Sequence, residues 1–461
     1  MREMPEQKNK RYEMDMCSGS VLKKMLLFSL PLMLSSILQL LFNAADIIVV
    51  GRFAGDESLA AVGSTSSLVN LLVNLFVGLS IGSNVLVAMY YGAKDKKSLG
   101  ETVHTAIALS VISGILLTIV GVLGAPVILH MMNTPEEVLN LAVIYLRVYF
   151  CGMTPMMLYN FGAAILRAMG DTKRPLYYLT IAGVVNISLN LIFVIVFRWD
   201  VFGVGLATTI SQIVSATFVI RCLMKSEGTI RLELSQLKLH KDKLRKILQV
   251  GLPAGIQGML FSVSNVVVQS SVNVFGATVV AGNSAALNIE GFIYASINAF
   301  NQGAVSFTSQ NVGAGKYHRI NRILFASIGC AMAVGMMMGF GAVLFGNSLL
   351  GLYTASPAVI KAGMLRLKIV GTTYVLCSIM DTIVGTLRGL GYSIMPMIVS
   401  LLGACAFRIV WIMTVFQIDA FHKIETVYWV YPISWAVTSM AHIICYMIVY
   451  RKLSRKWKVN L

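Results

Sequence analysis

A carboxylate lies on the polar face of an otherwise apolar segment near the start of the chain. In the stretch QLLFNAADIIVVG, Asn43 precedes Asp46 by about one helical turn, and Gln39 lies about one turn earlier again. This spacing places the three polar side chains on one face of a helix. An ionisable group inside a membrane span costs about 2.5–3.5 kcal/mol at mid-bilayer, so it requires a reason. An alternative is that Asp46, shortly before Gly51, lies at the outer membrane interface.

Further polar residues that could join this carboxylate occur in later apolar segments. Asn186 and Asn190 are one helical turn apart and therefore share a face. Thr208 follows in the next apolar segment. A carboxylate, two amides and a hydroxyl form an oxygen-rich set that suits a hard cation or a proton. Plain hydrogen bonding between helices is the alternative for the two asparagines.

The composition indicates a membrane protein. Of the 461 residues, 57% are hydrophobic and 12% are charged, whereas a soluble domain is nearer a quarter charged. Apolar runs of about twenty residues or more, without alternation, predict helices. The net charge of +17 comes mainly from basic residues between the spans, so we expect contact with anionic lipid and no nucleic-acid partner. The seven cysteines form no CxxC pair, so no metal is expected beyond Na⁺ at Asp46.

The predicted fold is an all-α polytopic membrane protein with twelve transmembrane helices in two pseudo-symmetric six-helix lobes. Basic residues concentrate in the N-terminal arm, the even-numbered connections and the tail. Both termini are therefore expected to be cytoplasmic, with the chain in the cell membrane. The predicted parts are a cytoplasmic arm (1–20), an N-lobe (21–223), a cytoplasmic linker (224–245), a C-lobe (246–450) and a cytoplasmic basic tail (451–461).

The two halves of the chain repeat each other. Pro31 and Pro253 are separated by as many residues as Pro135 and Pro357, and ILRAMGDTKRP in the first half matches TLRGLGYSIMP in the second. Each half has an even number of spans, so both halves begin on the same side of the membrane. Such a parallel repeat is typical of transporters with a central site between two lobes. We expect Pro31 and Pro253 to kink their helices.

Residues that break the repeat are the better candidates for function. Asp46 aligns with Val268, whereas Asn43 aligns with Asn265, so the carboxylate belongs to the first half alone. The two asparagines of the fifth span likewise align with aromatic residues, the first of them with Phe407. The asymmetric polar set is therefore confined to the first half.

Two acidic residues of the second half also break the repeat. Glu290 lies near the middle of the eighth span, and Asp381 lies in the tenth. Each could attract a cation, so we place both with Gln39, Asn43 and Asn265 among the candidate substrate-cavity residues. The alternative for each acid is an ion pair with a basic residue of the same half. The basic residues considered are Arg366, Lys368 and Arg408.

The chain resembles the multidrug and toxic compound extrusion (MATE) family of transporters over residues 21–450. The resemblance rests on DIIVVGRFAGDESLAAVG, YYGAKD, LRAMGDTKRP, SQNVGAGKYHRINR and LRGLGYSIMP. It implies two six-helix lobes that open alternately to either side of the membrane. It also implies export of amphipathic, often cationic compounds, driven by inward Na⁺ or H⁺. We expect no enzymatic activity, no cofactor, a monomer, and contact with membrane lipid.

The resemblance also assigns roles to individual residues. Many bacterial members carry Asn-x-x-Leu-Asp in the fifth helix, where this chain has Asn186-Ile-Ser-Leu-Asn190. An amide thus replaces the second carboxylate. One negative charge can take one proton or bind Na⁺ less strongly, so the coupling ion stays open between the two, with the proton favoured. The other corresponding residues are Asp46 for the first-helix aspartate, Pro31 for the bending proline, Gln39 for a polar cavity residue and Thr208 for the sixth-helix threonine.

Two other functions remain as alternatives. A lipid-linked glycan flippase of the same superfamily would need a strongly cationic cavity for pyrophosphate. Only Arg147, Arg366, Lys368 and Arg408 could line one here. A membrane-embedded enzyme is the second alternative, but no intramembrane histidine cluster, Ser-His pair or metal-ligand set supports it.

Overall fold

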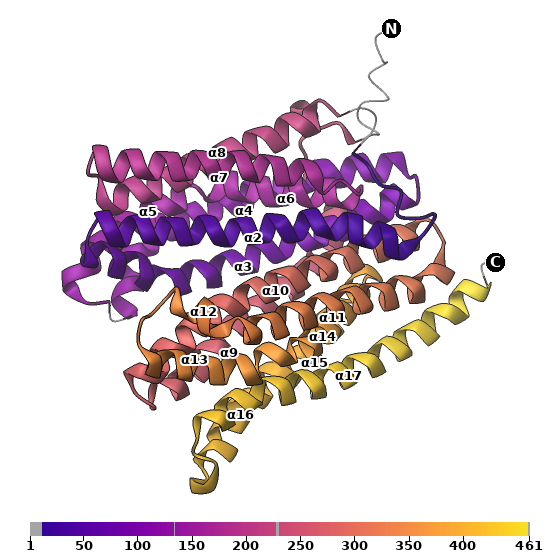
Figure 1. The fold of residues 1–461 in the computed structure, drawn as a ribbon. Coiled ribbons are helices and arrows are strands. Elements are labelled where there is room, and N and C mark those ends of the chain that lie inside the picture. Colours follow the sequence, from indigo (N-terminus) through magenta and orange to yellow (C-terminus); the bar gives the residue numbers. More distant parts are fainter. Residues whose placement is uncertain (1–11, 133, 227–229, 460–461) are drawn as a thin grey trace. The chain divides into compact units, whose positions relative to one another are not determined.

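The computed structural model describes residues 12–132, 134–226 and 230–459, and within them it consists of helices joined by short connections (Figure 1). Several helices of the first half, such as α4, α6 and α8, pack alongside one another. The helices of the first half are α2 (Val21–Phe53), α3 (Asp56–Gly92), α4 (Lys96–Met131), α5 (Glu136–Cys151), α6 (Met153–Ala168), α7 (Lys173–Leu191) with the π-helical turn η1 (Ile192–Val196), and α8 (Asp200–Met224).

The second half contains more interruptions than the first. The connection to it includes the 3-10 turn η3 (Leu234–Gln236). The helices are α9 (Lys241–Asn273), α10 (Ala277–Gly313), η4 (Tyr317–Arg319), α11 (Ile320–Leu344), α12 (Gly346–Gly351), α13 (Pro357–Ile369), η5 (Gly371–Thr373), α14 (Tyr374–Gly389), α15 (Ile394–Ser400) with the π-helical turn η6 (Leu401–Ala406), α16 (Phe407–Met413), η7 (Val415–Gln417), η8 (Asp419–Phe421) and α17 (Ile424–Val459).

The described helices account for the predicted spans. Ten stretches are long and apolar enough to cross a membrane, and α5 with α6 forms an eleventh that is bent by 44°. The remaining long helix, α10, has 37 residues and is more polar because it carries Glu290 and several amide side chains. Its length suffices to span a bilayer. The prediction of an all-α polytopic protein is confirmed.

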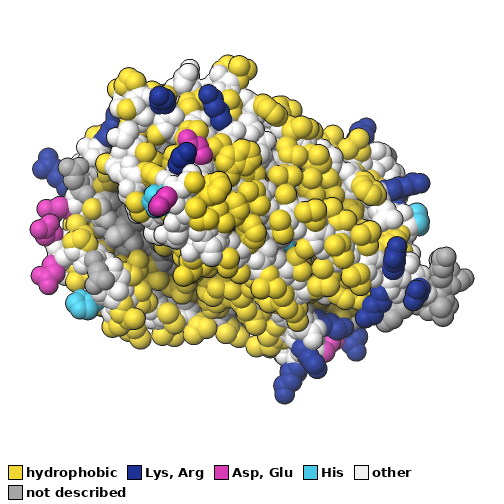
Figure 2. Space-filling view, turned by 90° about the horizontal axis from the view of Figure 1, so that it is seen from below, with side chains coloured by type: hydrophobic (Ala, Val, Ile, Leu, Met, Phe, Trp, Pro, Cys, Tyr) yellow, Lys and Arg dark blue, Asp and Glu magenta, His cyan; other side chains and the backbone are white. Residues whose placement is uncertain are grey.

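The outward-facing side chains are those of a protein surrounded by lipid. Leu123, Leu344 and Leu402 are 72%, 78% and 65% exposed. Figure 2 shows a face made mostly of hydrophobic side chains, with charged side chains gathered mainly toward its ends. Soluble monomers rarely expose such continuous apolar surface. The chain is therefore a multi-pass membrane protein.

Two compact units make up the described chain, and two helices pass from one unit to the other. The first unit contains Leu34–Gly255 and the described residues up to Asp15, and the second contains Met16–Met33 and the residues from Ile256 onward. Thus α2 and α9 each begin in one unit and end in the other. Each helix changes unit shortly after its internal proline, Pro31 or Pro253.

These units differ from the predicted lobes in the first halves of α2 and α9. The sequence repeat divides the chain at the linker 224–245, into lobes 21–223 and 246–450. Packing instead joins the beginning of each of these two helices to the opposite half of the repeat. The lobe division stays a prediction, as does a kink at Pro31 or Pro253.

Small residues let the first half of α9 approach α3 closely within the first unit. Gly78 and Gly82 on α3, and Gly251 and Gly255 on α9, each form a G-x-x-x-G pair. A Cβ on Gly78 would overlap the backbone of Gly255, and one on Gly251 would lie 2.7 Å from the Cα of Leu79. Paired small residues at this spacing allow two helix backbones to touch.

The second unit contains the repeat-related crossing, between α10 and the first half of α2. A Cβ on Gly303 would lie 2.6 Å from Sδ of Met25 and 3.1 Å from Oγ of Ser29. Phe28 also packs edge-on against Phe307, with ring centroids 5.5 Å apart. The repeat in the sequence is thus also a repeat in packing.

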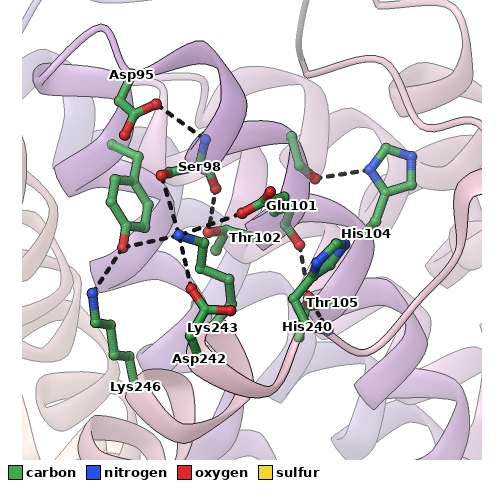
Figure 3. A network of polar contacts seen from close by, with 12 residues as sticks. Asp95, Ser98, Glu101, Thr102, His104, Thr105, His240, Asp242, Lys243 and Lys246 are labelled. Carbon is green, nitrogen blue, oxygen red and sulfur yellow. Dashed lines mark hydrogen bonds and ion pairs between the residues drawn. The ribbon is translucent and has the colours of Figure 1, made fainter.

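The first turn of α9 and the connection before it are fastened to α4 by polar contacts (Figure 3). The buried Lys243 places Nζ 3.1 Å from Oγ of Ser98 and 3.5 Å from Oε2 of Glu101. The backbone N–H of His240 donates to Oγ1 of Thr105 at 3.2 Å. Because these contacts involve both side chains and backbone, they fix where α9 begins.

The segment that precedes α2 is held in a corresponding way within the second unit. Met16 is fully buried. Lys316 donates from Nζ to the carbonyl oxygen of Cys17 at 2.8 Å, and Arg319 donates from Nη2 to that of Gly19 at 3.0 Å. Both helices that change unit are therefore anchored at their starting points.

We expect Gly255→Ala to lower the thermal stability of the purified protein. The added Cβ would overlap the carbonyl oxygen of Leu75, and such overpacking costs about 1–3 kcal/mol. The control is Gly291→Ala on α10, where a Cβ meets nothing within 4 Å. Equal melting temperatures for the two variants would contradict the close crossing.

We expect Lys243→Met to loosen the connection before α9. It removes hydrogen bonds that involve a charged group, worth about 1.5–3 kcal/mol each. Cleavage after Glu233 by a glutamate-specific protease should become faster than in the wild type. Lys241→Met is the control, because Lys241 is exposed. Unchanged cleavage of the Lys243→Met protein would show that Lys243 does not fasten this segment.

Candidate functional site

The four predicted cation-site residues come together in the first unit. Asp46 lies on the second half of α2, Asn186 and Asn190 lie on α7, and Thr208 lies on α8. Asn190 donates from Nδ2 to Oδ1 of Asp46, and the same nitrogen lies 3.5 Å from Oδ1 of Asn186. Asn186 donates from Nδ2 to Oγ1 of Thr208 at 3.4 Å. The four side chains therefore form one hydrogen-bonded chain across three helices.

One buried polar atom of these four side chains has no hydrogen-bond partner among the described residues. Asn190 is fully buried, and its Oδ1 accepts no hydrogen bond from any described residue. A buried oxygen without a donor is an acceptor available to a cation. Asp46, which is half-buried, supplies a carboxylate beside it. No group of three His, Cys, Asp or Glu side chains that could hold a metal occurs in the described part of the chain.

Two local features place Asn190 opposite Asp46. Gly183 on α7 faces the ring of Phe42 on α2, and a Cβ at this position would overlap that ring. Glycine therefore permits the approach of the two helices. Two residues after Asn190, at Ile192, the π-helical turn η1 begins, and such turns are frequent at functional sites.

The two other polar residues of this helix face lie outside the hydrogen-bonded chain. Gln39 and Asn43 are exposed on α2, and their cavity role stays a prediction. Sequence analysis missed Tyr145 and Tyr149 of α5, which are close enough to Asp46 to interact with it electrostatically. Their one-turn spacing was the available signal, but it does not show which helix they face.

Glu290 forms an ion pair in the second unit, which was the alternative to a cation-attracting role. Arg366 donates from Nε and Nη2 to the two carboxylate oxygens, each at 2.8 Å. Asn283 accepts from Nη1 of Arg366 at 2.9 Å, and Tyr374 donates to Glu290 at 3.4 Å. A bidentate pair of this kind is strong. The carboxylate is neutralised in this arrangement, so attraction of a cationic substrate would require the pair to open.

Asp381 faces an arginine that was not among the partners considered from the sequence. It is buried on α14 and interacts electrostatically with Arg388, two turns further along the same helix. Tyr294 is also close enough to the carboxylate to interact with it electrostatically, and Sγ of Cys377 lies 4.0 Å from its Oδ2. Residues two turns apart share a helix face, which explains why Arg388 is the near cation. Arg388 also donates from Nη2 to Oε1 of Gln257 at 2.9 Å.

Arg408 contacts neither acid. It donates from Nε to Oγ of Ser434 at 3.1 Å and from Nη1 to Oδ1 of Asn265 at 3.3 Å. Its guanidinium lies over the ring of Tyr431, 4.4 Å from the centroid. Lys368 is exposed. Of the three basic residues considered, only Arg366 therefore pairs with an acid of the described chain.

A family model described as MatE matches residues 31–192 and 253–414. The two matched segments begin at Pro31 and Pro253, so the match reproduces the internal repeat of the sequence. Together they cover more than half of the chain.

Individual relatives match over most of their own length. Probable multidrug resistance protein YoeA of Bacillus subtilis (strain 168) is 27% identical over 442 residues, which are 94% of this chain and 95% of the relative. Probable multidrug resistance protein NorM of Thermotoga maritima is 24% identical over 394 residues, 84% of each chain. A solved structure of a multidrug resistance MATE family transporter of the MOP superfamily, in an outward-facing conformation, has the same fold. It superposes with a TM-score of 0.89 at 23% identity, over 95% of this chain and 98% of that one. The chain belongs to the MatE family, the multidrug and toxic compound extrusion transporters, which are not enzymes.

Proposed function

We propose that this transporter is an antiporter that exports amphipathic compounds, cationic ones among them, in exchange for H⁺ or Na⁺. Relatives named as multidrug resistance and multidrug export proteins support the substrate class. The observation that carries the proposed coupling is the chain formed by Asp46, Asn190, Asn186 and Thr208. It combines one carboxylate with one buried amide oxygen that has no donor.

The charge of this site favours a proton as the coupling ion. Asp46 is the one ionisable residue among these four hydrogen-bonded side chains, and a single proton neutralises it. Sodium would have Asp46, Oδ1 of Asn190 and neighbouring oxygens as ligands, but with a single negative charge among them. Because the charge of the ligands sets much of the affinity for a hard cation, we infer weaker Na⁺ binding than at a site with two carboxylates.

The connectivity of α2 offers a route from ion binding to a change of conformation. Asp46 lies on the half of α2 that packs in the first unit, whereas the half before Pro31 packs in the second. Protonation removes the charge that accepts the hydrogen bond from Asn190, so it weakens the contact of α2 with α7. A ligand shifts a conformational equilibrium only through its differential affinity for the two states. The cation must therefore bind one access state more tightly than the other.

A lipid-linked glycan flippase receives less support from the same residues. Glu290 neutralises Arg366, and Arg147 is exposed and donates to the carbonyl oxygen of Val122 at 3.1 Å. Of the four basic residues considered, Arg408 alone is then both buried and without an acid among the described residues, which is too little charge for pyrophosphate. The antiporter proposal therefore stands first.

We expect Asp46→Asn to uncouple transport. In proteoliposomes, the variant should retain binding of a cationic dye but lose the acceleration of dye efflux by an imposed proton or Na⁺ gradient, by at least about tenfold. Asp419→Asn is the control, because Asp419 is an exposed acid in the connection before α17. Full gradient-driven efflux by the Asp46→Asn protein would refute the proposal.

We expect Asn190→Asp to increase the dependence of efflux on Na⁺. A second carboxylate beside Asp46 strengthens binding of a hard cation by oxygen ligands. The measurement is dye efflux as Na⁺ replaces K⁺ at constant ionic strength and pH. If the variant and the wild type respond equally to Na⁺, Asn190 is not part of the ion site.

A further inference from the structure

Arg408 carries a buried positive charge that no acid of the described chain balances. It lies in a membrane-spanning stretch, Ile394–Gln417, and is 3% exposed. The two buried acids of this unit lie near other arginines: Glu290 is ion-paired with Arg366, and Asp381 interacts electrostatically with Arg388. An uncompensated charge inside a span is costly and marks a functional position by default.

The hydrogen bonds of Arg408 fix the orientation of Asn265. A guanidinium can only donate, so Asn265 must present Oδ1 to Nη1 of Arg408, as observed at 3.3 Å. The Nδ2 group of Asn265 then points away from the guanidinium and donates to no described residue. Nη2 of Arg408 likewise has no acceptor among the described residues. Two neighbouring N–H groups are therefore left to donate to a ligand.

The chemistry of these donors selects the ligand. A carboxylate, sulfonate or phosphate presents two or more oxygens that can accept from adjacent N–H groups, and a charged pair makes these hydrogen bonds strong. Asn265 is exposed, so its amide is accessible to a ligand.

Aromatic side chains adjoin the same guanidinium. The rings of Tyr431 and Trp435 lie 4.4 Å and 6.0 Å from the guanidinium carbon of Arg408. Stacking on these rings holds the guanidinium plane in place. Both rings are themselves buried, so they position Arg408 rather than offer surface to a ligand.

The repeat relates the helices that carry this cation to those that carry the carboxylate site of the first half. Asn265 aligns with Asn43, one turn before Asp46, and Arg408 directly follows Phe407, the counterpart of Asn186. In the first half, α2 and α7 thus bring together a carboxylate and an amide. In the second half, the related elements α9 and α16 bring together an amide and a guanidinium.

We propose that Arg408 and Asn265 form an anion subsite, which binds the carboxylate or sulfonate group of an exported amphipathic compound. This inference rests on the proposed export function and extends its substrates from cationic compounds to anionic and zwitterionic ones. Arg408 supplies the charge, and Asn265 supplies a second donor held in place by Arg408.

Binding of two dansyl probes that differ in charge tests the subsite. Purified protein in phosphatidylcholine nanodiscs is titrated with anionic dansylglycine and with a dansylamidoethyl-trimethylammonium salt, and dansyl fluorescence is followed. We expect Arg408→Gln to weaken dansylglycine binding by at least about tenfold, because a charged hydrogen-bond donor is lost. Binding of the cationic probe should stay within about twofold, and Arg408→Lys should recover part of the anion affinity.

Asn265→Asp provides a test that does not remove the arginine. The new carboxylate would pair with Arg408 and occupy the subsite from within, so dansylglycine binding should be lost while the melting temperature is kept or raised. Ser270→Asp is the control, because it places the same charge at another exposed position of α9. Unchanged dansylglycine binding in Arg408→Gln and Asn265→Asp, or no binding by the wild type, would overturn the subsite.

Two further measurements distinguish the anion subsite from a lipid-headgroup site and from the proposed antiport function. If phosphatidylglycerol added to the nanodiscs displaces dansylglycine from the wild type, the occupant is a lipid headgroup, and assignment to an exported compound is wrong. Gradient-driven efflux of the cationic probe is measured separately in proteoliposomes. If no gradient-driven efflux of the cationic probe occurs, the proposed antiport function is wrong. The anion subsite does not depend on that result, because it is tested by binding of dansylglycine to the purified protein.

Discussion

The cost of placing charge inside a lipid-embedded fold determines how the polar residues of this protein are arranged. In the second unit, Glu290 is matched by Arg366 through two hydrogen bonds of 2.8 Å, and Asp381 faces Arg388. In the first unit, Asp46 is met by the amide of Asn190 rather than by a cation. An amide stabilises a carboxylate without neutralising it. Asp46 thus has no cationic partner among the described residues, which is the basis of its proposed role in binding the coupling ion.

The helices α2 and α9 connect the site at Asp46 to both packing units. Each begins in one packing unit and ends in the other, and each is anchored at its start, α9 by Lys243 and α2 by Lys316 and Arg319. The G-x-x-x-G contact of α9 with α3 leaves no space for sliding without loss of packing. A change in how α2 packs near Asp46 therefore acts on a helix that belongs to both units. This would provide a physical basis for the proposed transport mechanism.

The helical class, the repeat and the grouping of Asp46, Asn186, Asn190 and Thr208 could be predicted because each depends on pattern along the sequence, whereas the role of these four residues as a cation site stays a proposal. Asp46, Asn186, Asn190 and Thr208 break the repeat or share a helix face, and the structure joins them by hydrogen bonds. The packing of the first halves of α2 and α9 with the opposite half of the repeat could not be predicted, because it depends on contacts between distant helices. The same holds for the pairing of Glu290 with Arg366 rather than with Arg408, which depends on contacts between helices. Phe42 against Gly183 is a further contact of this kind. Arg388, by contrast, lies two turns from Asp381 on one helix, so its nearness could have been predicted.

The central claim is that Asp46 couples the binding of a cation to the binding of substrate. Linkage requires that two such ligands change each other's affinity by the same factor. The most direct measurement is the affinity of the purified protein for a cationic probe across a range of pH and Na⁺ concentration. The account predicts that this affinity falls as the coupling ion, H⁺ or Na⁺, becomes more concentrated. An affinity independent of both pH and Na⁺ would contradict it.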